Sequence, residues 1–292
     1  PELRAADRGA IFEVVRKDIN AFDVETELAP ADLRLLRLCL SSDTRRNHLL
    51  LTRLLEAGAA DAESVCRLVG QRPELLRTLP AFFSIQIVAG CPQLCAYCPY
   101  PQFGIRATGR QGEMALERFL VLADKIRDFC GDAVLSVSLW GEPAYYGRFP
   151  ELAAAVRERG LRLLVETSGV GWDPARLTEV APGADLDWIV SLDADGPELY
   201  RALRGEGYEE ALRVIDLLAS RFPSRVHVQA VRMKENEEQL EDFYRAWKAR
   251  TGKVIIQKYD HFCGLLPDRR VADLSPLKRF PCWHLKRDLA VL

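Results

Sequence analysis

The sequence predicts an α/β protein centred on a partial (β/α)6 barrel, with a helical N-terminal region before it and a short cysteine-bearing extension after it. Six short runs rich in aromatic and β-branched residues follow residue 80, and helical patterns separate them. No comparable run precedes residue 80. Alternating strands and helices favour parallel βαβ units with right-handed crossovers, which curl into an open sheet or barrel.

The chain divides into three expected regions. Residues 1–79 form the helical N-terminal region, residues 80–264 the barrel, and residues 265–292 the start of the extension. Because the first residue is Pro1 and not Met, we expect the sequence to be a piece of a longer protein.

Composition excludes some classes of function. The 292 residues carry 40 basic and 42 acidic side chains, a net charge of −2, which gives no reason to expect a nucleic-acid or anionic-membrane partner. No apolar run approaches the length of a membrane span, and no signal peptide opens the sequence. Three of the eight cysteines crowd together, which indicates metal ligation in a reducing compartment. We therefore expect a cytoplasmic protein.

The N-terminal region contains two apolar patterns of helical spacing. Leu33, Leu36 and Leu40 recur at i, i+3 and i+7 after Pro30, and a second pattern runs through residues 49–55. A helix is expected at each.

Six strands are expected in the barrel, and active-site loops should follow their carboxyl ends. The expected strands are 82–88, 133–140, 161–167, 188–192, 226–231 and 254–259. Expected helices include 114–129, 207–220 and 237–250, with Asn236 as the cap of the last.

The loop after the first strand carries three cysteines. Cys91, Cys95 and Cys98 have C-x3-C-x2-C spacing. They can ligate three irons of a [4Fe-4S] cubane and leave the fourth iron open, as catalysis requires. The alternative is a structural zinc site completed by a distant histidine or cysteine.

With Tyr97 before the third cysteine, this loop resembles the C-x3-C-x-aromatic-C signature of the radical S-adenosylmethionine (SAM) superfamily. The resemblance implies that SAM chelates the open iron, and that reductive cleavage gives methionine and a 5′-deoxyadenosyl radical that abstracts hydrogen from substrate. It places Tyr97 beside the adenine. It also implies a one-electron donor such as a flavodoxin or ferredoxin.

Later strand ends resemble further segments of that family. Gly141, Glu142 and Pro143 follow Trp140, which replaces the first glycine of the family's G-G-E-P segment. The resemblance implies that this segment binds the methionyl amino group of SAM. The third strand ends in 166–169, similar to the family's T-N-G turn.

The fourth strand ends in Ser191-Leu192-Asp193, and Arg204 follows in a Leu-Arg-Gly segment. Together these resemble the S-L-D…R-G block of the SPASM branch. The resemblance implies that Ser191 and Arg204 contact SAM, with the arginine pairing with its carboxylate; Arg201 is the rival for that role.

The remaining candidates lie near the last two strands. Gln229 is expected to face SAM or substrate. Asp260 and Cys263 are candidate catalytic donors of a proton or hydrogen atom, as is His261, and turn formation or packing is the alternative for each.

The C-terminal residues end in an expected strand, 289–292, without a partner. Cys282 before it resembles the first ligand of an auxiliary iron–sulfur cluster in a SPASM extension, and a single buried cysteine is the alternative. The closest resemblance, over residues 80–292, is to the spirochaete-type SPASM (spiro-SPASM) group. Cys39, Cys66 and Cys130 are expected in the core.

The sequence therefore predicts a radical SAM enzyme with a [4Fe-4S] cluster, SAM and, in the full-length protein, an auxiliary Fe-S cluster. By family analogy its substrate is a peptide or protein; a small-molecule substrate is the alternative. A non-catalytic structural metal-binding protein is the alternative from a different class, and it would not need to bind SAM.

Overall fold

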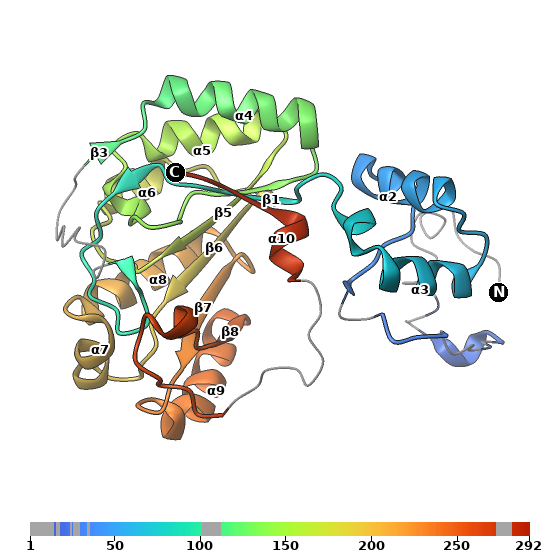
Figure 1. Cartoon of the computed structure of the whole chain (residues 1–292). Helices are drawn as coiled ribbons and strands as arrows, with labels where there is room; N and C mark the ends of the chain where they lie inside the picture. Colours follow the sequence, from blue (N-terminus) through green and yellow to red (C-terminus); the bar gives the residue numbers. More distant parts are fainter. Residues whose placement is uncertain are drawn as a thin grey trace.

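The computed structural model describes residues 15, 18–23, 25, 30–33, 36–100, 112–272 and 282–292. A large body contains a twisted sheet with helices outside it, and a small helical body lies beside the amino-terminal end of β1 (Figure 1). None of the described helices is long and apolar enough to cross a membrane.

The large body confirms the α/β prediction. Seven parallel strands are arranged in the order β8-β7-β6-β5-β4-β1-β9. Their bounds are β1 Phe82–Ile85, β4 Val134–Ser136, β5 Arg162–Thr167, β6 Leu186–Ser191, β7 Val226–Arg232, β8 Val254–Lys258 and β9 Asp288–Val291. The six expected strands follow one another across the sheet, as a partial barrel requires.

The expectation of a partnerless strand near the C-terminus is wrong. Strand β9 pairs in parallel with β1, with Phe82 opposite Asp288 and Ile85 opposite Val291. The Gln86 amide donates to the Val291 carbonyl at 2.9 Å. Pairing here covers the edge of β1 that the other strands leave open, and an open edge is unfavourable. Only the tertiary structure brings the tail, some 200 residues later, back to β1.

Two expected strands, 82–88 and 133–140, are at least three residues shorter than predicted. After β1 the chain leaves the sheet and forms β2 (Val88–Ala89), which pairs antiparallel with β3 (Gly112–Glu113). This small ribbon lies between β1 and the cysteine loop. Strand β4 likewise ends at Ser136, because the residues after it turn into the second loop of the barrel mouth.

Helices cover the outer face of the sheet (Figure 1). They are α4 Leu116–Cys130, α5 Phe149–Glu158, α6 Pro174–Glu179, α7 Pro197–Arg204, α8 Tyr208–Arg221 and α9 Leu240–Thr251. Trp188 of β6 lies in the core between these layers, with its ring 5.7 Å from Phe149, 5.6 Å from Trp172 and 5.6 Å from Phe222. Such aromatic packing stabilises the contact between sheet and helices.

The strand register separates two faces of the sheet. Val165, Trp188 and Val228 belong to the core under the helices. Side chains alternate along a strand, so Glu166 and Ile189, which lie opposite each other in β5 and β6, point to the concave face.

The small body is helical, as expected. It contains η2 (Ile19–Ala21), α2 (Arg45–Glu56), α3 (Ala62–Gln71) and η4 (Pro73–Leu76). The helix predicted at residues 49–55 is confirmed within α2.

The helix predicted from Leu33 to Leu40 is wrong for the described residues. No α-helix occurs at 30–33 or 36–42, and Arg37 has a φ of 46°. Leu36 is nevertheless buried in a cluster with Leu50 and Val69. The apolar spacing reflects packing of an irregular segment on α2 and α3, and not a helix.

Arg46 fastens the small body to the barrel. Its guanidinium donates to the carbonyls of Leu79 at 2.9 Å and Pro80 at 2.7 Å, and pairs with Asp132 at 2.6 Å. These partners precede β1 and β4. The small body is therefore attached at the amino-terminal end of the strands, opposite the loops expected to be active.

Candidate active site

The cysteine loop begins against the second loop of the barrel mouth. The Glu142 amide donates to the Gly90 carbonyl at 2.9 Å. A Cβ on Gly141 would lie 2.0 Å from the carbonyl oxygen of Val88, so only glycine fits there. Two segments identified separately in the sequence are thus brought into backbone contact.

The same loop is docked on the end of α7. The amides of Leu94 and Ala96 donate to the carbonyls of Arg204 and Leu203, at 2.9 and 2.8 Å. These carbonyls lie in the last turn of a helix, where they lack partners within the helix. The buried Gln93 amide group adds a bond of 2.7 Å to the backbone just after α7. Three of the four loop residues 93–96 are therefore held from one side.

The three thiols fit an iron–sulfur cluster. Cys91, Cys95 and Cys98 are free and half-buried. Thiolates are the donors that iron–sulfur clusters use. Burial raises the pKa of Cys95 to about 11 and raises those of Cys91 and Cys98 above their ordinary range, so metal binding must displace protons.

In the described part of the chain, no three histidine, cysteine or acidic side chains converge on one point as ligands of a single metal ion. A cubane offers a separate iron to each thiolate, so its ligands need not converge in that way.

Asp193 connects the cysteine loop to two strand ends. Its carboxylate pairs with Arg204 at 2.5 Å and accepts from the Tyr97 hydroxyl at 2.8 Å and the Val231 amide at 2.6 Å. Arg204 also donates to the Tyr97 hydroxyl. Asp193 is 1% exposed and Arg204 2%, so the pair is shielded from water. Asp193 could be recognised in the sequence as part of the Ser-Leu-Asp block, but no role was expected for its side chain.

The two arginines of α7 face different surroundings. The exposed Arg201 pairs with Glu206 at 2.7 Å. Arg204 is buried beside the cysteine loop, and its Nε has no hydrogen-bond partner among the described residues. The structure thus places Arg204, and not Arg201, next to Cys95 and Tyr97. Its contact with the SAM carboxylate stays a prediction.

Asn236 is not the expected helix cap. Its side chain makes no capping bond and is fully buried. Its oxygen accepts from the Met233 amide at 2.9 Å, and its nitrogen donates to the carbonyls of Asp193 at 3.0 Å and Val231 at 2.9 Å. Asn236 therefore ties the ends of β6 and β7 together. Because Asp193 lies 43 residues away from Asn236 in the sequence, no local pattern predicts this contact.

Glu142 joins the loops after β4 and β5. Its carboxylate accepts from the Ser168 amide at 2.8 Å, the Ala144 amide at 3.4 Å and the Thr167 hydroxyl. Burial raises the pKa of this carboxyl, and the hydrogen bonds oppose that shift. Pro143 follows as the first residue of η6 (Pro143–Tyr145). The contact of this segment with the SAM amino group stays a prediction.

Trp140, which replaces a glycine of the family segment, forms part of the wall. Its ring stacks on Tyr100 with centroids 6.2 Å apart. The Tyr100 hydroxyl accepts from the Gly90 amide at 3.1 Å, which fixes the start of the cysteine loop.

Two predicted contacts lie on the concave face. Ser191 accepts a hydrogen bond of 3.3 Å from the Gln229 side chain, because these residues are opposite each other in β6 and β7. Both remain predicted contacts of SAM or substrate.

The predicted catalytic residues after β8 are in a turn. Asp260 is exposed and accepts from the Phe262 amide at 2.7 Å, and His261 accepts from the Gly264 amide at 2.8 Å. Cys263 is exposed with a φ of 55°. Turn formation thus accounts for Asp260, while the catalytic roles stay predictions.

The outlying cysteines have different environments. Cys130 is buried as expected, and Cys66 is half-buried. Cys39 is exposed, so its predicted core position is wrong; it lies in the irregular segment before α2. Cys282 is exposed, directly before α10 (Trp283–Arg287), and its role as an auxiliary-cluster ligand stays a prediction.

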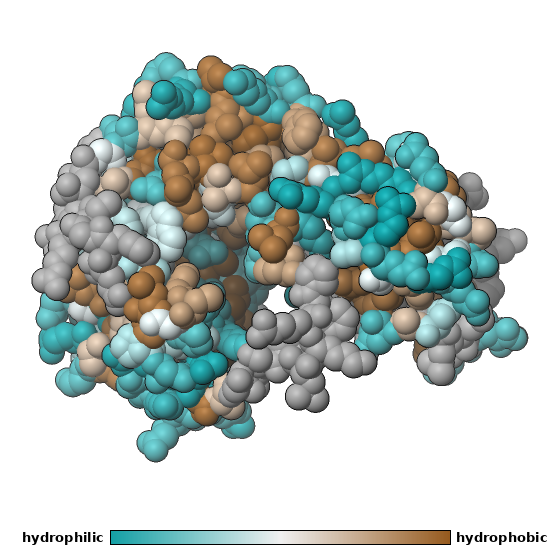
Figure 2. Space-filling view, in the orientation of Figure 1, coloured by the Kyte–Doolittle hydropathy of each residue, from teal (hydrophilic) through white to brown (hydrophobic). Residues whose placement is uncertain are grey.

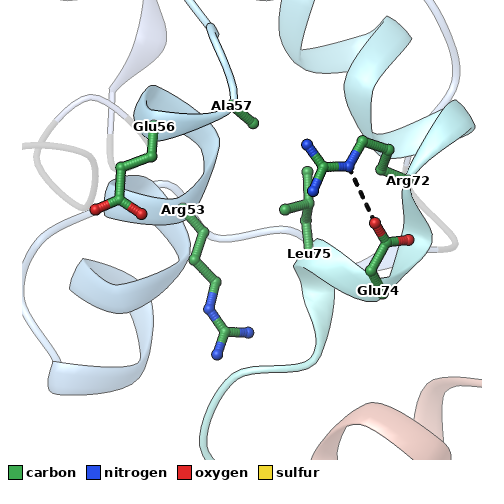
Figure 3. A pocket seen from close by; sticks show the side chains of 6 residues that line it. All are labelled: Arg53, Glu56, Ala57, Arg72, Glu74 and Leu75. Carbon is green, nitrogen blue, oxygen red and sulfur yellow. Dashed lines mark hydrogen bonds and ion pairs between the residues drawn. The ribbon is translucent and has the colours of Figure 1, made fainter.

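A hollow of about 310 Å³ lies in the small body and not at the cysteine loop of the barrel (Figure 3). Arg53 and Glu56 of α2 line one side and Arg72 and Glu74 the other. The Arg72 guanidinium already donates to Glu74 at 3.0 Å, so the charges of these two side chains offset each other.

Comparison with known proteins identifies the family. The sequence profile of the Radical SAM superfamily matches residues 85–246, more than half of the chain, and the chain belongs to that superfamily. It is an enzyme of the radical SAM class, whose cofactors are a [4Fe-4S] cluster and SAM.

Similar proteins include an uncharacterized protein of Treponema pallidum (strain Nichols), 39% identical across 96% of this chain and 81% of that protein. The PqqA peptide cyclase of Ruegeria pomeroyi is 29% identical over 59% of this chain and 45% of the cyclase.

Among solved structures, Streptococcus suis SuiB bound to the precursor peptide SuiA has a TM-score of 0.57 at 13% identity, over 92% of this chain and 55% of SuiB. This likeness shows the fold alone. The chain spans about half the length of the cyclase and of SuiB.

Proposed function

We propose that this chain is the SAM-cleaving part of a SPASM-branch enzyme that modifies a peptide or protein, with Cys91, Cys95 and Cys98 as the cluster ligands. The observation that carries the proposal is the cysteine loop. Three free thiols with the family's spacing lie at the carboxyl end of the barrel strands, where active sites of such barrels form.

When bound, the cluster and SAM supply the one-electron chemistry that starts hydrogen abstraction from substrate. The protein holds and orients these groups and excludes water. The Asp193–Arg204 pair and the end of α7 fix the cysteine loop. Gly141, in the loop after β4, binds the amino group of SAM, Ser191, at the end of β6, also contacts SAM, and the Tyr97 ring lies beside the adenine.

The peptide substrate is supported by likeness only. The Ruegeria relative is a peptide cyclase, and SuiB was solved with a precursor peptide. Within the same proposal, residues 265–292 begin an extension in which Cys282 ligates an auxiliary cluster, and a flavodoxin or ferredoxin delivers the electron. Eight free cysteines favour a reducing compartment, so we place the protein in the cytoplasm.

The test is anaerobic reconstitution with iron and sulfide, followed by reduction with SAM. Absorbance near 400 nm and release of 5′-deoxyadenosine are expected, and Cys91→Ala, Cys95→Ala and Cys98→Ala each abolish both. Cys66→Ala is the matched control, because Cys66 lies on α3 in the small body. Uptake of one zinc ion per chain, without iron–sulfur absorbance or SAM cleavage, would show a structural site instead.

A further inference from the structure

The concave face of the sheet carries several polar side chains. The register places Ser84 beside Ser136 and, nearer the mouth, Ser191 beside Gln229, with Glu166 on the same face. Interiors of (β/α) barrels are usually filled by Val, Ile and Leu. Filling of the barrel interior therefore does not explain why these side chains are polar. Figure 2 shows this part of the large body as a recess with hydrophilic and hydrophobic residues on its walls.

The opposite half of the concave face is closed by ion pairs. Asp187 of β6 pairs with Arg162 at 3.2 Å and with Arg225 at 3.3 Å. On the same face, Leu164 of β5 lies opposite Asp187, and Ile189 of β6 lies opposite Glu166, one step nearer the mouth. A ligand that enters from the mouth thus meets Ser191 and Gln229 first, and then Glu166 with the apolar Ile189 beside it.

Glu166 is the exception among the acidic groups of this face. Its amide donates to the Ser138 hydroxyl at 2.9 Å, but its carboxylate makes no ion pair or hydrogen bond with any residue that the structure describes. Asp187, on the same face, has two arginines. Burial alone raises the pKa of Glu166, since no cation offsets the loss of hydration.

A half-buried carboxylate without a partner is costly, and such groups concentrate at functional sites. The position of Glu166 agrees with that role. It directly precedes Thr167, whose hydroxyl binds Glu142, and it lies between the strand that leads to Gly141 and the strand that ends in Ser191. Its side chain therefore faces the interior just below the residues proposed to bind SAM.

We propose that Glu166 binds the cationic side chain of a lysine or arginine of the substrate and so selects a basic peptide. This inference rests on the proposed function above, which supplies the peptide. The cation provides the charge and hydrogen bonds that the carboxylate lacks, and the aliphatic stem packs on Ile189, which lies opposite Glu166. The ammonium or sulfonium of SAM itself is the competing source of positive charge, and the experiment separates the two.

The experiment uses the reconstituted protein with SAM and measures binding of N-acetyl-lysine amide and N-acetyl-arginine amide by saturation-transfer NMR. N-acetyl-norleucine amide is the neutral probe of similar shape. The wild type is expected to prefer the cationic probes at least about tenfold, and Glu166→Gln to lose that preference, as the loss of a charge-assisted bond predicts. Glu166→Lys is expected to prefer N-acetyl-glutamate amide.

Glu158→Gln is the matched control, because Glu158 is exposed on α5 outside the barrel, and it should keep the wild-type preference. Equal binding of lysine and norleucine probes to the wild type would overturn the inference. So would an equal loss of SAM affinity in Glu166→Gln, which would assign the carboxylate to SAM. Wild-type release of 5′-deoxyadenosine in the same samples shows whether the proposed function stands when the inference fails.

Discussion

Gly141 lies so close to Val88 that a Cβ on the glycine would approach the Val88 carbonyl oxygen to 2.0 Å. The obstructing atom belongs to the backbone between β1 and the cysteine loop, and it has no rotamer that would relieve the clash. The contact joins the first two loops of the barrel mouth and sets where the cysteines begin.

Gly141→Ala is therefore expected to lower the free energy of unfolding by about 3 kcal/mol, as overpacking of a rigid contact does. Urea unfolding followed by circular dichroism measures this change. Gly70→Ala is the control, because a Cβ at Gly70 of α3 meets nothing within 4 Å. The control is expected to stabilise the protein slightly, since alanine favours a helix. Equal effects of the two changes would contradict the assigned contact.

Asp193→Asn is expected to destabilise the protein by about 3–5 kcal/mol, because it leaves the buried Arg204 without its counter-charge. The midpoint of urea unfolding measures it. Arg201→Gln removes an exposed pair with Glu206 on the same helix and should leave the midpoint unchanged. If Asp193→Asn behaved like Arg201→Gln, the buried pair would not be what holds the cysteine loop on α7.

Glu166→Gln is expected to stabilise the protein at neutral pH in the absence of substrate. The pKa of Glu166 is raised in the folded state, so the native chain binds more protons than the unfolded chain, and stability falls as pH rises from about 4.5 through the raised pKa. Glutamine does not ionise, so the variant does not lose this stability as the pH rises. Thermal midpoints of both proteins at pH 5 and pH 7.5 test this, and the advantage of the variant should be larger at pH 7.5. An advantage that shrinks at the higher pH would mean that the carboxylate has a stabilising partner.

Removal of residues 288–292 is expected to lower the thermal midpoint and promote aggregation, because it uncovers the outer edge of β1. Differential scanning fluorimetry and light scattering measure the two effects. Removal of Leu292 alone is the control, since that residue follows β9 and is 82% exposed. Unchanged behaviour of the longer deletion would show that β9 contributes little to the sheet.

Arg46→Ala is expected to loosen the small body from the barrel. The guanidinium makes three contacts with the connecting segment and Asp132, and a neutral side chain makes none. Limited trypsin digestion should cut faster at Arg77 in the connection, whereas Arg67→Ala on exposed α3 should keep the wild-type rate of cleavage at Arg77. Identical digestion patterns would contradict the role of Arg46.

Local patterns were sufficient for most of the barrel. Each strand from β5 to β8 could be recognised because its apolar residues lie within one short segment of the chain. Asn236 shows where such reasoning stops. Its cap-like position is local, but its actual partners are backbone groups at two strand ends that only the folded sheet brings together.

The sequence alone determined the αβ alternation, the helical N-terminal region and the spacing of Cys91, Cys95 and Cys98, because each depends on residues within one turn, strand or loop. Tertiary structure decided that β9 returns to β1, that Arg204 is buried against Asp193, and that Glu166 faces the interior without a partner in the described chain. Those features arise from contacts between residues 11 to more than 200 positions apart, and a linear pattern does not record which distant group fills a given space.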